Sequence, residues 1–380
     1  MIRLLIAGDF SPVDRLYQLV ENEAFDKIFT NVKPVIERSN YSIVNFETTV
    51  AKKTDKSILK HGPALHCSSK AIDAIKWAGF DMVTLANNHF RDYGDDAVKK
   101  SIYEIKKRGL DYVGGGVNIN EASSVLYKNI ADRTFAFVNV CEHEFSIASE
   151  NHAGSNPLEP IKQYYQISEA KQNSDYVIVI THGGHEYYQL PSPRMKQLYR
   201  FFIDVGADAV INHHQHCYTG YEVYKEHPIF YGIGNFCFDR IYKINSIWNE
   251  GFMVELILDN HKIGYNLIPY TQFSDNPSIE LMKGNRAQLF DAQIKKFNDI
   301  IANDDKLSDC FNQFVDSKAE YVLSTFTPYS NRYLRFLSKK GLLPRFLPKS
   351  KILSILNYVN CESHRDILIK LLTQKTANNK

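Results

Sequence analysis

Potential metal ligands follow five short apolar runs of the sequence, each at the point where a β-strand is expected to end. In chain order these residues are Asp9, Asn45, Glu47, Asn87, Asn88, His89, His182, His185, Glu186, His213, His214 and His216. Ligands of α/β sheets bind beyond the carboxyl ends of the strands, so we expect these side chains to gather at one edge. Asp, Glu, Asn and His together suit two divalent cations about 3.5–4 Å apart. Carboxylate with imidazole favours Mn, Fe or Zn over Ca or Mg.

The stretch "INHHQHCYTG" contains three of these histidines within four positions. Side chains alternate between the two faces of an extended chain, so His214 and His216 are expected to share one face and His213 the other. By the same alternation Asn45 and Glu47 share a face. Each feature alone is weak, because a single histidine is more often a hydrogen-bonded core residue than a ligand. The prediction of a metal site rests on their conjunction.

The elements that must position these residues alternate between strand-like and helical patterns, which is typical of an α/β fold. The predicted strands span 3–9, 41–47, 81–87, 134–140, 175–184, 208–214, 228–236, 251–259 and 262–270. The last two flank "NHK" and predict a β-hairpin. Residues 68–78 and 95–108 have helical patterns, and after about Asn276 only helices are expected.

Six blocks in this order resemble the CapA family of poly-γ-glutamate and capsule synthesis proteins, a branch of the calcineurin-like metallophosphatase superfamily. The blocks are "GDFSP", "NFETTV", "LANNHFRDYG", "THGGHEYY", "GADAVINHHQHC" and "YGIGNF". The resemblance covers roughly the first 270 residues. It implies a four-layer αββα metallophosphatase-like sandwich over residues 1–275, with a C-terminal helical subdomain over 276–380.

The resemblance also implies roles for individual residues. It implies that the metal ligands are Asp9, Glu47, Asn88, His182, His214 and His216. His89 resembles the histidine that assists the leaving oxygen, Asp92 matches a residue that could orient it, and Glu186 either supports a ligand or faces the substrate. Asn45, Asn87 and Asn235 are expected near the substrate or behind the ligands.

Two positions depart from the superfamily pattern. Ser11 stands where a metal-binding histidine is usual, which weakens the first metal site. Asn212 replaces a glycine, which is tolerable if the position needs a left-handed backbone. The glycines of "YGIGNF", Gly232 and Gly234, either let the chain pass close to the site or permit tight packing. His185 and His213 are expected to be structural.

Together these features predict a phosphoesterase that acts in the synthesis of a capsule, a polysaccharide or a poly-γ-glutamate-type surface polymer. Its expected substrate is a phosphorylated small molecule or a polymer precursor. Two alternatives stay open. The first is a non-catalytic module that binds polymer or a partner through a degenerate metal site. The second is hydrolysis or transfer at an amide bond of γ-glutamyl chains.

Composition limits the partners and the compartment. A net charge of +2 gives no electrostatic case for nucleic acid. No secretory leader or membrane-spanning run is evident, so the cytoplasm is the expected location. Six scattered cysteines are expected to be free and mostly buried. The basic, aromatic stretch "RYLRFLSKKGLLPRFLPKSK" raises the alternative of a peripheral contact with the inner face of a membrane.

Overall fold

The computed structural model describes residues 1–259, 262–329, 331–344 and 346–377. The chain divides into two compact units, Met1–Asp309 and Cys310–Lys380, which are described separately. The division between these units falls between Asp309 and Cys310. The domain boundary that the sequence predicts at residues 275–276 stays a prediction.

The first unit contains an eight-stranded sheet with the order β16-β15-β14-β1-β2-β3-β4, in which β13 lies beside β1. Its strands are β1 (Ile2–Phe10), β2 (Tyr41–Phe46), β3 (Met82–Thr84), β4 (Asp111–Val113), β13 (Asn235–Cys237), β14 (Glu250–Asp259), β15 (Lys262–Gln272) and β16 (Ile279–Leu281). β1 to β4 and β13 are parallel, and their register places Asp9 opposite both Asn45 and Asn235. Three predicted site residues therefore lie at one level of neighbouring strands.

The antiparallel edge of this sheet tests two predictions. β14 and β15 pair antiparallel, as expected for the hairpin, while its turn residues 260–261 lie outside the described residues. The expectation of helices alone after Asn276 is wrong, because β16 pairs with β15. A strand of three residues is too short to leave a periodic pattern.

A six-stranded sheet has the order β11-β12-β10-β9-β7-β6. Its strands are β6 (Leu126–Ile130), β7 (Arg133–Cys141), β9 (Tyr176–His182), β10 (Ala209–His213), β11 (Tyr221–Tyr224) and β12 (His227–Phe230). β7, β9, β10 and β12 are parallel, and the register aligns Cys141, His182 and His213 at the strand ends. Two short strands, β5 (Gly115–Gly116) and β8 (Gly154–Ser155), form a separate pair.

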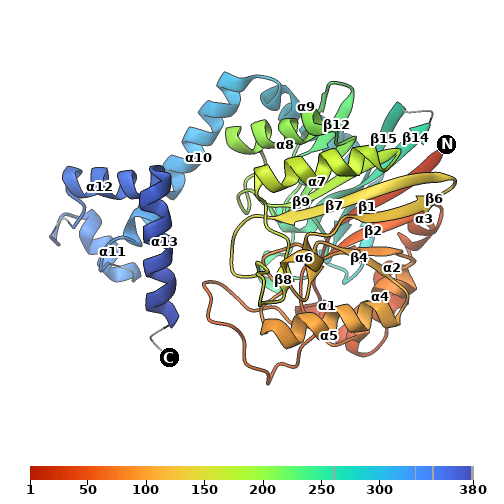
Figure 1. The fold of residues 1–380 in the computed structure, drawn as a ribbon, viewed down its shortest axis with the longest axis horizontal. Helices are drawn as coiled ribbons and strands as arrows, with labels where there is room; N and C mark the ends of the chain where they lie inside the picture. Colours follow the sequence, from red (N-terminus) through yellow and green to blue (C-terminus); the bar gives the residue numbers. More distant parts are fainter. Residues whose placement is uncertain (260–261, 330, 345, 378–380) are drawn as a thin grey trace. The chain divides into compact units, whose positions relative to one another are not determined.

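Helices cover the outer faces of both sheets. α7 and α8 lie over the six-stranded sheet, and α4 and α5 lie over the eight-stranded sheet, so the first unit has four layers (Figure 1). The helices of this unit are α1 (Asp14–Glu21), α2 (Phe25–Phe29), α3 (Lys33–Glu37), α4 (Lys70–Ala78), α5 (Gly94–Lys107), α6 (Ile119–Ala122), α7 (Pro160–Gln172), α8 (Pro193–Val205) and α9 (Asn285–Ile301). The predicted αββα layering is confirmed.

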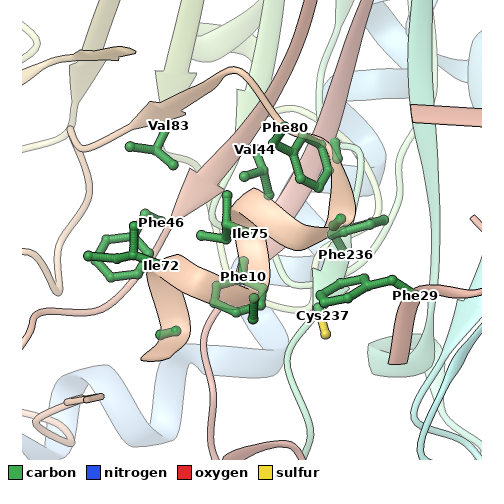
Figure 2. Close-up of a cluster of buried hydrophobic side chains, with 14 of the residues drawn as sticks. Phe10, Phe29, Val44, Phe46, Ile72, Ile75, Phe80, Val83, Phe236 and Cys237 are labelled. Carbon is green, nitrogen blue, oxygen red and sulfur yellow. The ribbon is translucent and has the colours of Figure 1, made fainter. Parts of the chain in front are cut away.

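A large apolar core lies between the eight-stranded sheet and the helices beside it. In α4, Ile72 and Ile75 share one face of the helix and point toward Val44 and Phe46 of β2 (Figure 2). Burying each of these side chains contributes about 1.5–3 kcal/mol. This packing fixes β1 and β2 against the helical layer, and these two strands deliver the acidic residues of the site.

The remaining helices belong wholly or partly to the second unit. They are α10 (Asp304–Ser324), which begins in the first unit, α11 (Arg332–Lys339), α12 (Lys349–Asn360) and α13 (Glu362–Ala377). Over the part of the chain that the structure describes, no helix combines the length and the apolarity needed to cross a membrane.

Candidate metal centre

The carboxyl ends of strands from both sheets supply the candidate metal ligands. Asp9 is near the end of β1, Glu47 follows β2, and His182 is the last residue of β9. His214 and His216 follow β10. All five side chains are buried, so the elements that carry them bring charged and imidazole groups together away from water.

Glu47, His182 and His214 form a first group whose ligand atoms all lie within 4.8 Å of one another. Nε2 of His182 is 3.1 Å from Nδ1 of His214 and 3.7 Å from a carboxylate oxygen of Glu47. The amide oxygen of Asn88 is also 3.1 Å from Nε2 of His182. A single proton on Nε2 of His182 could form a hydrogen bond with only one of these three neighbours. Glu47, Asn88, His182 and His214 can instead all direct lone pairs at one cation.

Asp9, Glu47 and His216 form a second group within the same 4.8 Å limit. His216 Nδ1 is 3.7 Å from Asp9 Oδ2, and its Nε2 is 3.8 Å from Glu47 Oε1. Metal–ligand bonds of about 2.0–2.2 Å separate the ligands of one ion by roughly 3–4 Å, so the first group, and the pair of Glu47 Oε1 with Nε2 of His216, have the spacing of a coordination shell.

Glu47 belongs to both groups and is the most unusual side chain of the site. Both of its carboxylate oxygens are buried without a hydrogen-bond partner. Burial raises the pKa of Glu47 well above its usual value, and the charges of Asp9 and Glu186 add to the effect. A buried anion that lacks a partner is costly, and a cation shared by the two groups would supply one.

Two of the ligand histidines, His182 and His216, have pKa values that favour the neutral form that metal binding requires. Burial lowers the pKa of His182 well below its usual value, and the neighbouring His214 lowers it further. The pKa of His216 is lowered for the same two reasons, in the same order. Neutral imidazoles with a carboxylate therefore fit a divalent metal such as Mn, Fe or Zn.

Asparagines support these ligands. Asn45 donates from its amide nitrogen to Asp9 Oδ1 at 2.7 Å and lies 3.3 Å from His182 Nδ1. Asn235 Oδ1 is 2.9 Å from His216 Nδ1. A hydrogen bond at this nitrogen leaves Nε2 of His216 as the nitrogen available to a metal, which is the usual pattern for a metal-bound histidine.

A second polar cluster surrounds His89. Its Nδ1 lies 2.6 Å from Asp92 Oδ2, the residue that the family resemblance suggested could orient it, and Lys60 contacts the other oxygen of the same carboxylate. Asn87 Oδ1 accepts from the backbone N–H of His89 at 3.1 Å. Burial lowers the pKa of His89, although Asp92 opposes the shift. The ring is therefore fixed through Nδ1, and Nε2 is the nitrogen left for chemistry.

The backbone of the histidine loop, residues 213–216, differs from the extended conformation that the sequence pattern indicated. β10 ends at His213, and His214 and His216 have left-handed backbone angles, with φ of 89° and 55°. The expectation of an extended chain is therefore wrong here, although both side chains face the predicted ligands. Burial raises the pKa of Cys217 to about 12, and neither ligand group contains this thiol.

Asn212 and His213 lie behind the site. Asn212 is a strand residue without positive φ, so the left-handed backbone considered for it is absent. Its amide instead accepts from Thr181 and donates to the carbonyl of Gly183. His213 is buried with Nε2 3.1 Å from the carbonyl oxygen of Ala7. It joins the two sheets, as expected for a structural histidine.

Close packing explains one glycine of "YGIGNF". Gly234 has φ of 79°, and a Cβ on Gly234 would meet the Glu250 carbonyl oxygen at 2.7 Å; a Cβ on Gly8 would in turn meet the Gly234 carbonyl oxygen at 1.9 Å. These strands therefore approach more closely than side chains would allow. Near the same site Glu186 is exposed and acts on Glu47 through its charge, while His185 is half-buried and its ring is 6.5 Å from that of Tyr188.

Sequence reasoning missed four residues around the centre. Asn88 donates to Glu144 at 3.3 Å, and Nε2 of His214 is 3.8 Å from the same carboxylate. Glu144 follows β7, so the strand-end rule could have found it. The other three residues, Lys60, Trp248 and Tyr187, leave no such signal in the sequence. Lys60 contacts Asp92. The ring centroid of Trp248 is 4.6 Å from that of His216 and 6.0 Å from that of Tyr187.

Comparison with known proteins assigns the chain to a protein family. A family model described as "Bacterial capsule synthesis protein PGA_cap" matches residues 3–240, more than half of the chain. The chain belongs to this family. All the predicted site residues, from Asp9 to Asn235, lie inside the part that the PGA_cap model matches, and the second unit lies outside it.

Individual relatives agree with the PGA_cap assignment. The "Capsule biosynthesis protein CapA" of Bacillus anthracis is 35% identical over 63% of this chain and 60% of its own. The "PGA biosynthesis protein CapA" of Bacillus subtilis (strain 168) is 34% identical over 61% of this chain and 62% of its own. The match thus spans about three fifths of each relative. A solved structure, titled a hypothetical protein from Thermus thermophilus, has a TM-score of 0.46 at 15% identity, over 74% of this chain and all of that one.

Proposed function

We propose that this chain is a metal-dependent hydrolase of the metallophosphatase type, which acts on a phosphoester during the synthesis of a capsule or poly-γ-glutamate-type surface polymer. The observation that carries the proposal is Glu47, a buried carboxylate without a partner that is shared by two ligand groups. The names of the two CapA relatives support the setting in polymer synthesis.

The two groups would hold two divalent ions, Mn, Fe or Zn. Asp9, Glu47 and His216 would hold one, and Glu47, Asn88, His182 and His214 the other. When bound, such ions stabilise negative charge on a phosphoryl group and lower the pKa of water.

The remaining residues would position the substrate and move protons. With Nδ1 of His89 turned to Asp92, its Nε2 is free to exchange a proton with the leaving oxygen. The ion pair of Asp92 with Lys60 holds this carboxylate in place. General acid–base assistance of this kind contributes typically 10²–10⁴-fold.

A substrate screen tests the proposal. Purified protein supplied with Mn²⁺ or Zn²⁺ is assayed on phosphomonoesters, phosphodiesters and γ-glutamyl peptides. We expect hydrolysis of a phosphoester that His216→Ala abolishes, while His227→Ala, in a histidine at the start of β12, leaves it unchanged. Cleavage restricted to γ-glutamyl peptides would support amide chemistry instead.

One observation favours a non-catalytic binding module. Ser11, which replaces a ligand of the superfamily, is buried and its hydroxyl has no hydrogen-bond partner. Among the described residues, the second group therefore offers only three ligands of the His, Cys, Asp or Glu type. Metal analysis separates the two functions, because two ions per chain support the enzyme, whereas none or one supports binding.

A further inference from the structure

A short part of the second unit is strongly basic. Residues 331–351 contain no aspartate or glutamate. Their seven cations are Arg332, Arg335, Lys339, Lys340, Arg345, Lys349 and Lys351. Because the whole chain has a net charge of only +2, the positive charge is concentrated here. Such a surface attracts an anionic partner.

α11 displays cations and aromatic rings on the same exposed face. At 100° per residue, Arg332, Tyr333, Phe336, Lys339 and Lys340 lie within about a third of the helix circumference. All five are exposed, and the exposed fractions of Tyr333 and Phe336 are 82% and 58%. Lys339 contacts Glu320 at 3.3 Å, an exposed pair that is worth little.

Further exposed apolar side chains follow α11 along the chain. Leu342, in the turn that follows, is 69% exposed, and Phe346 is also exposed. In α12, Ile352, Leu353 and Leu356 are exposed as well. The exposed rings of Tyr333 and Phe336, three residues apart on α11, lie side by side, and exposed apolar groups of this kind mark a surface for a partner or a membrane.

We propose that α11 and the described residues from there to Leu353 form a surface that binds anionic phospholipid bilayers peripherally. Cations gain from the negative headgroups, and the rings of Tyr333 and Phe336 gain from the boundary between headgroups and acyl chains. An anionic bilayer supplies both environments within one surface. This proposal does not depend on the chemistry of the metal centre.

Two other occupants fit the surface less well. A polyanionic polymer would meet the cations but would leave Tyr333, Phe336 and Leu342 in water. A second copy of the chain would cover the apolar side chains but would bring two sets of seven cations together. Of these three occupants, only the bilayer matches both the charge and the exposed rings.

Vesicle co-sedimentation of the full chain tests the proposal. We expect binding to phosphatidylcholine vesicles that contain phosphatidylglycerol, weak binding to phosphatidylcholine alone, and a loss of binding as salt is raised. The triple variant Arg332→Gln/Lys339→Gln/Lys340→Gln should bind roughly a hundredfold more weakly. The control Lys27→Gln/Lys295→Gln/Lys296→Gln makes the same charge change on residues of the first unit and should bind as the wild type does.

A second variant separates lipid binding from charge alone. Tyr333→Ser/Phe336→Ser keeps every cation and should still weaken binding at least about tenfold, since two aromatic side chains are lost from the interface. Equal binding by this variant, or equal binding to both kinds of vesicle, would overturn the proposal. So would preferential binding of soluble poly-γ-glutamate, or a concentration-dependent dimer that the serine variant abolishes.

Discussion

Replacing Glu47 by glutamine should raise the stability of the metal-free protein and reduce its affinity for metal. The substitution keeps the shape of the side chain and removes an acidic group whose two oxygens are buried and unpartnered. An unsatisfied buried polar group costs about 1–3 kcal/mol, and more when it is charged. Removing this ionisable group, whose pKa is raised by folding, should therefore increase the free energy of unfolding near neutral pH by that order, or roughly 2 °C of melting temperature per kcal/mol.

The effect on metal binding should have the opposite direction and should be larger. Substitution of a residue that only supports a ligand lowers metal affinity by 10–100-fold. Loss of Glu47, a ligand common to both groups, should therefore lower the metal affinity of each group at least about a hundredfold. Differential scanning fluorimetry with and without Mn²⁺ measures both effects, because binding to the folded state raises the melting temperature.

Glu255→Gln is the matched control for Glu47→Gln. Glu255 is equally buried but is well paired, with Asn266 donating at 2.8 Å and with Arg3 and Arg38 at 3.1 and 3.3 Å. Its substitution should lower stability and leave the Mn²⁺-dependent rise unchanged. If Glu47→Gln instead destabilises the metal-free protein as Glu255→Gln does, the interpretation of Glu47 as an unpaired ligand is refuted.

Three further predictions concern pH and the residues beside the ligands. Because the pKa of Glu47 is raised, the folded metal-free protein retains a proton on this carboxyl group, and a bound metal must displace it. The Mn²⁺-dependent rise in melting temperature should therefore grow as pH increases above about 4.5. A rise that is independent of pH would contradict this role of Glu47. Asn235→Leu removes the hydrogen bond to His216 and should weaken metal binding 10–100-fold in a titration. An unchanged metal affinity would instead show that Asn235 contributes only packing. His89→Gln should lower kcat 10²–10⁴-fold with two metals still bound, and loss of metal in this variant would instead make His89 a ligand.

Much of the fold could be predicted from the sequence because its sheets are built of short buried runs. The polar residues Asp9 and His182 were predictable near the ends of β1 and β9, since apolar runs give way there to polar residues. β16 was not, because three residues carry no periodicity.

The candidate site was predictable in its residues and not in its local geometry. The polar residues at the strand ends are close in the structure because parallel strands end at the same edge. The turns at His214 and His216 depend on positive φ, which no residue type in "NHHQH" signals reliably. Lys60 is brought to Asp92 by a loop with no regular pattern, so only the folded chain reveals this ion pair.

The central claim is that two metal ions share Glu47. Electron paramagnetic resonance of the protein loaded with two equivalents of Mn²⁺ tests it most directly, because ions about 3.5–4 Å apart are magnetically coupled. The proposed site predicts a coupled multiline spectrum that Glu47→Gln abolishes. A six-line spectrum of isolated Mn²⁺ at every loading would contradict the claim.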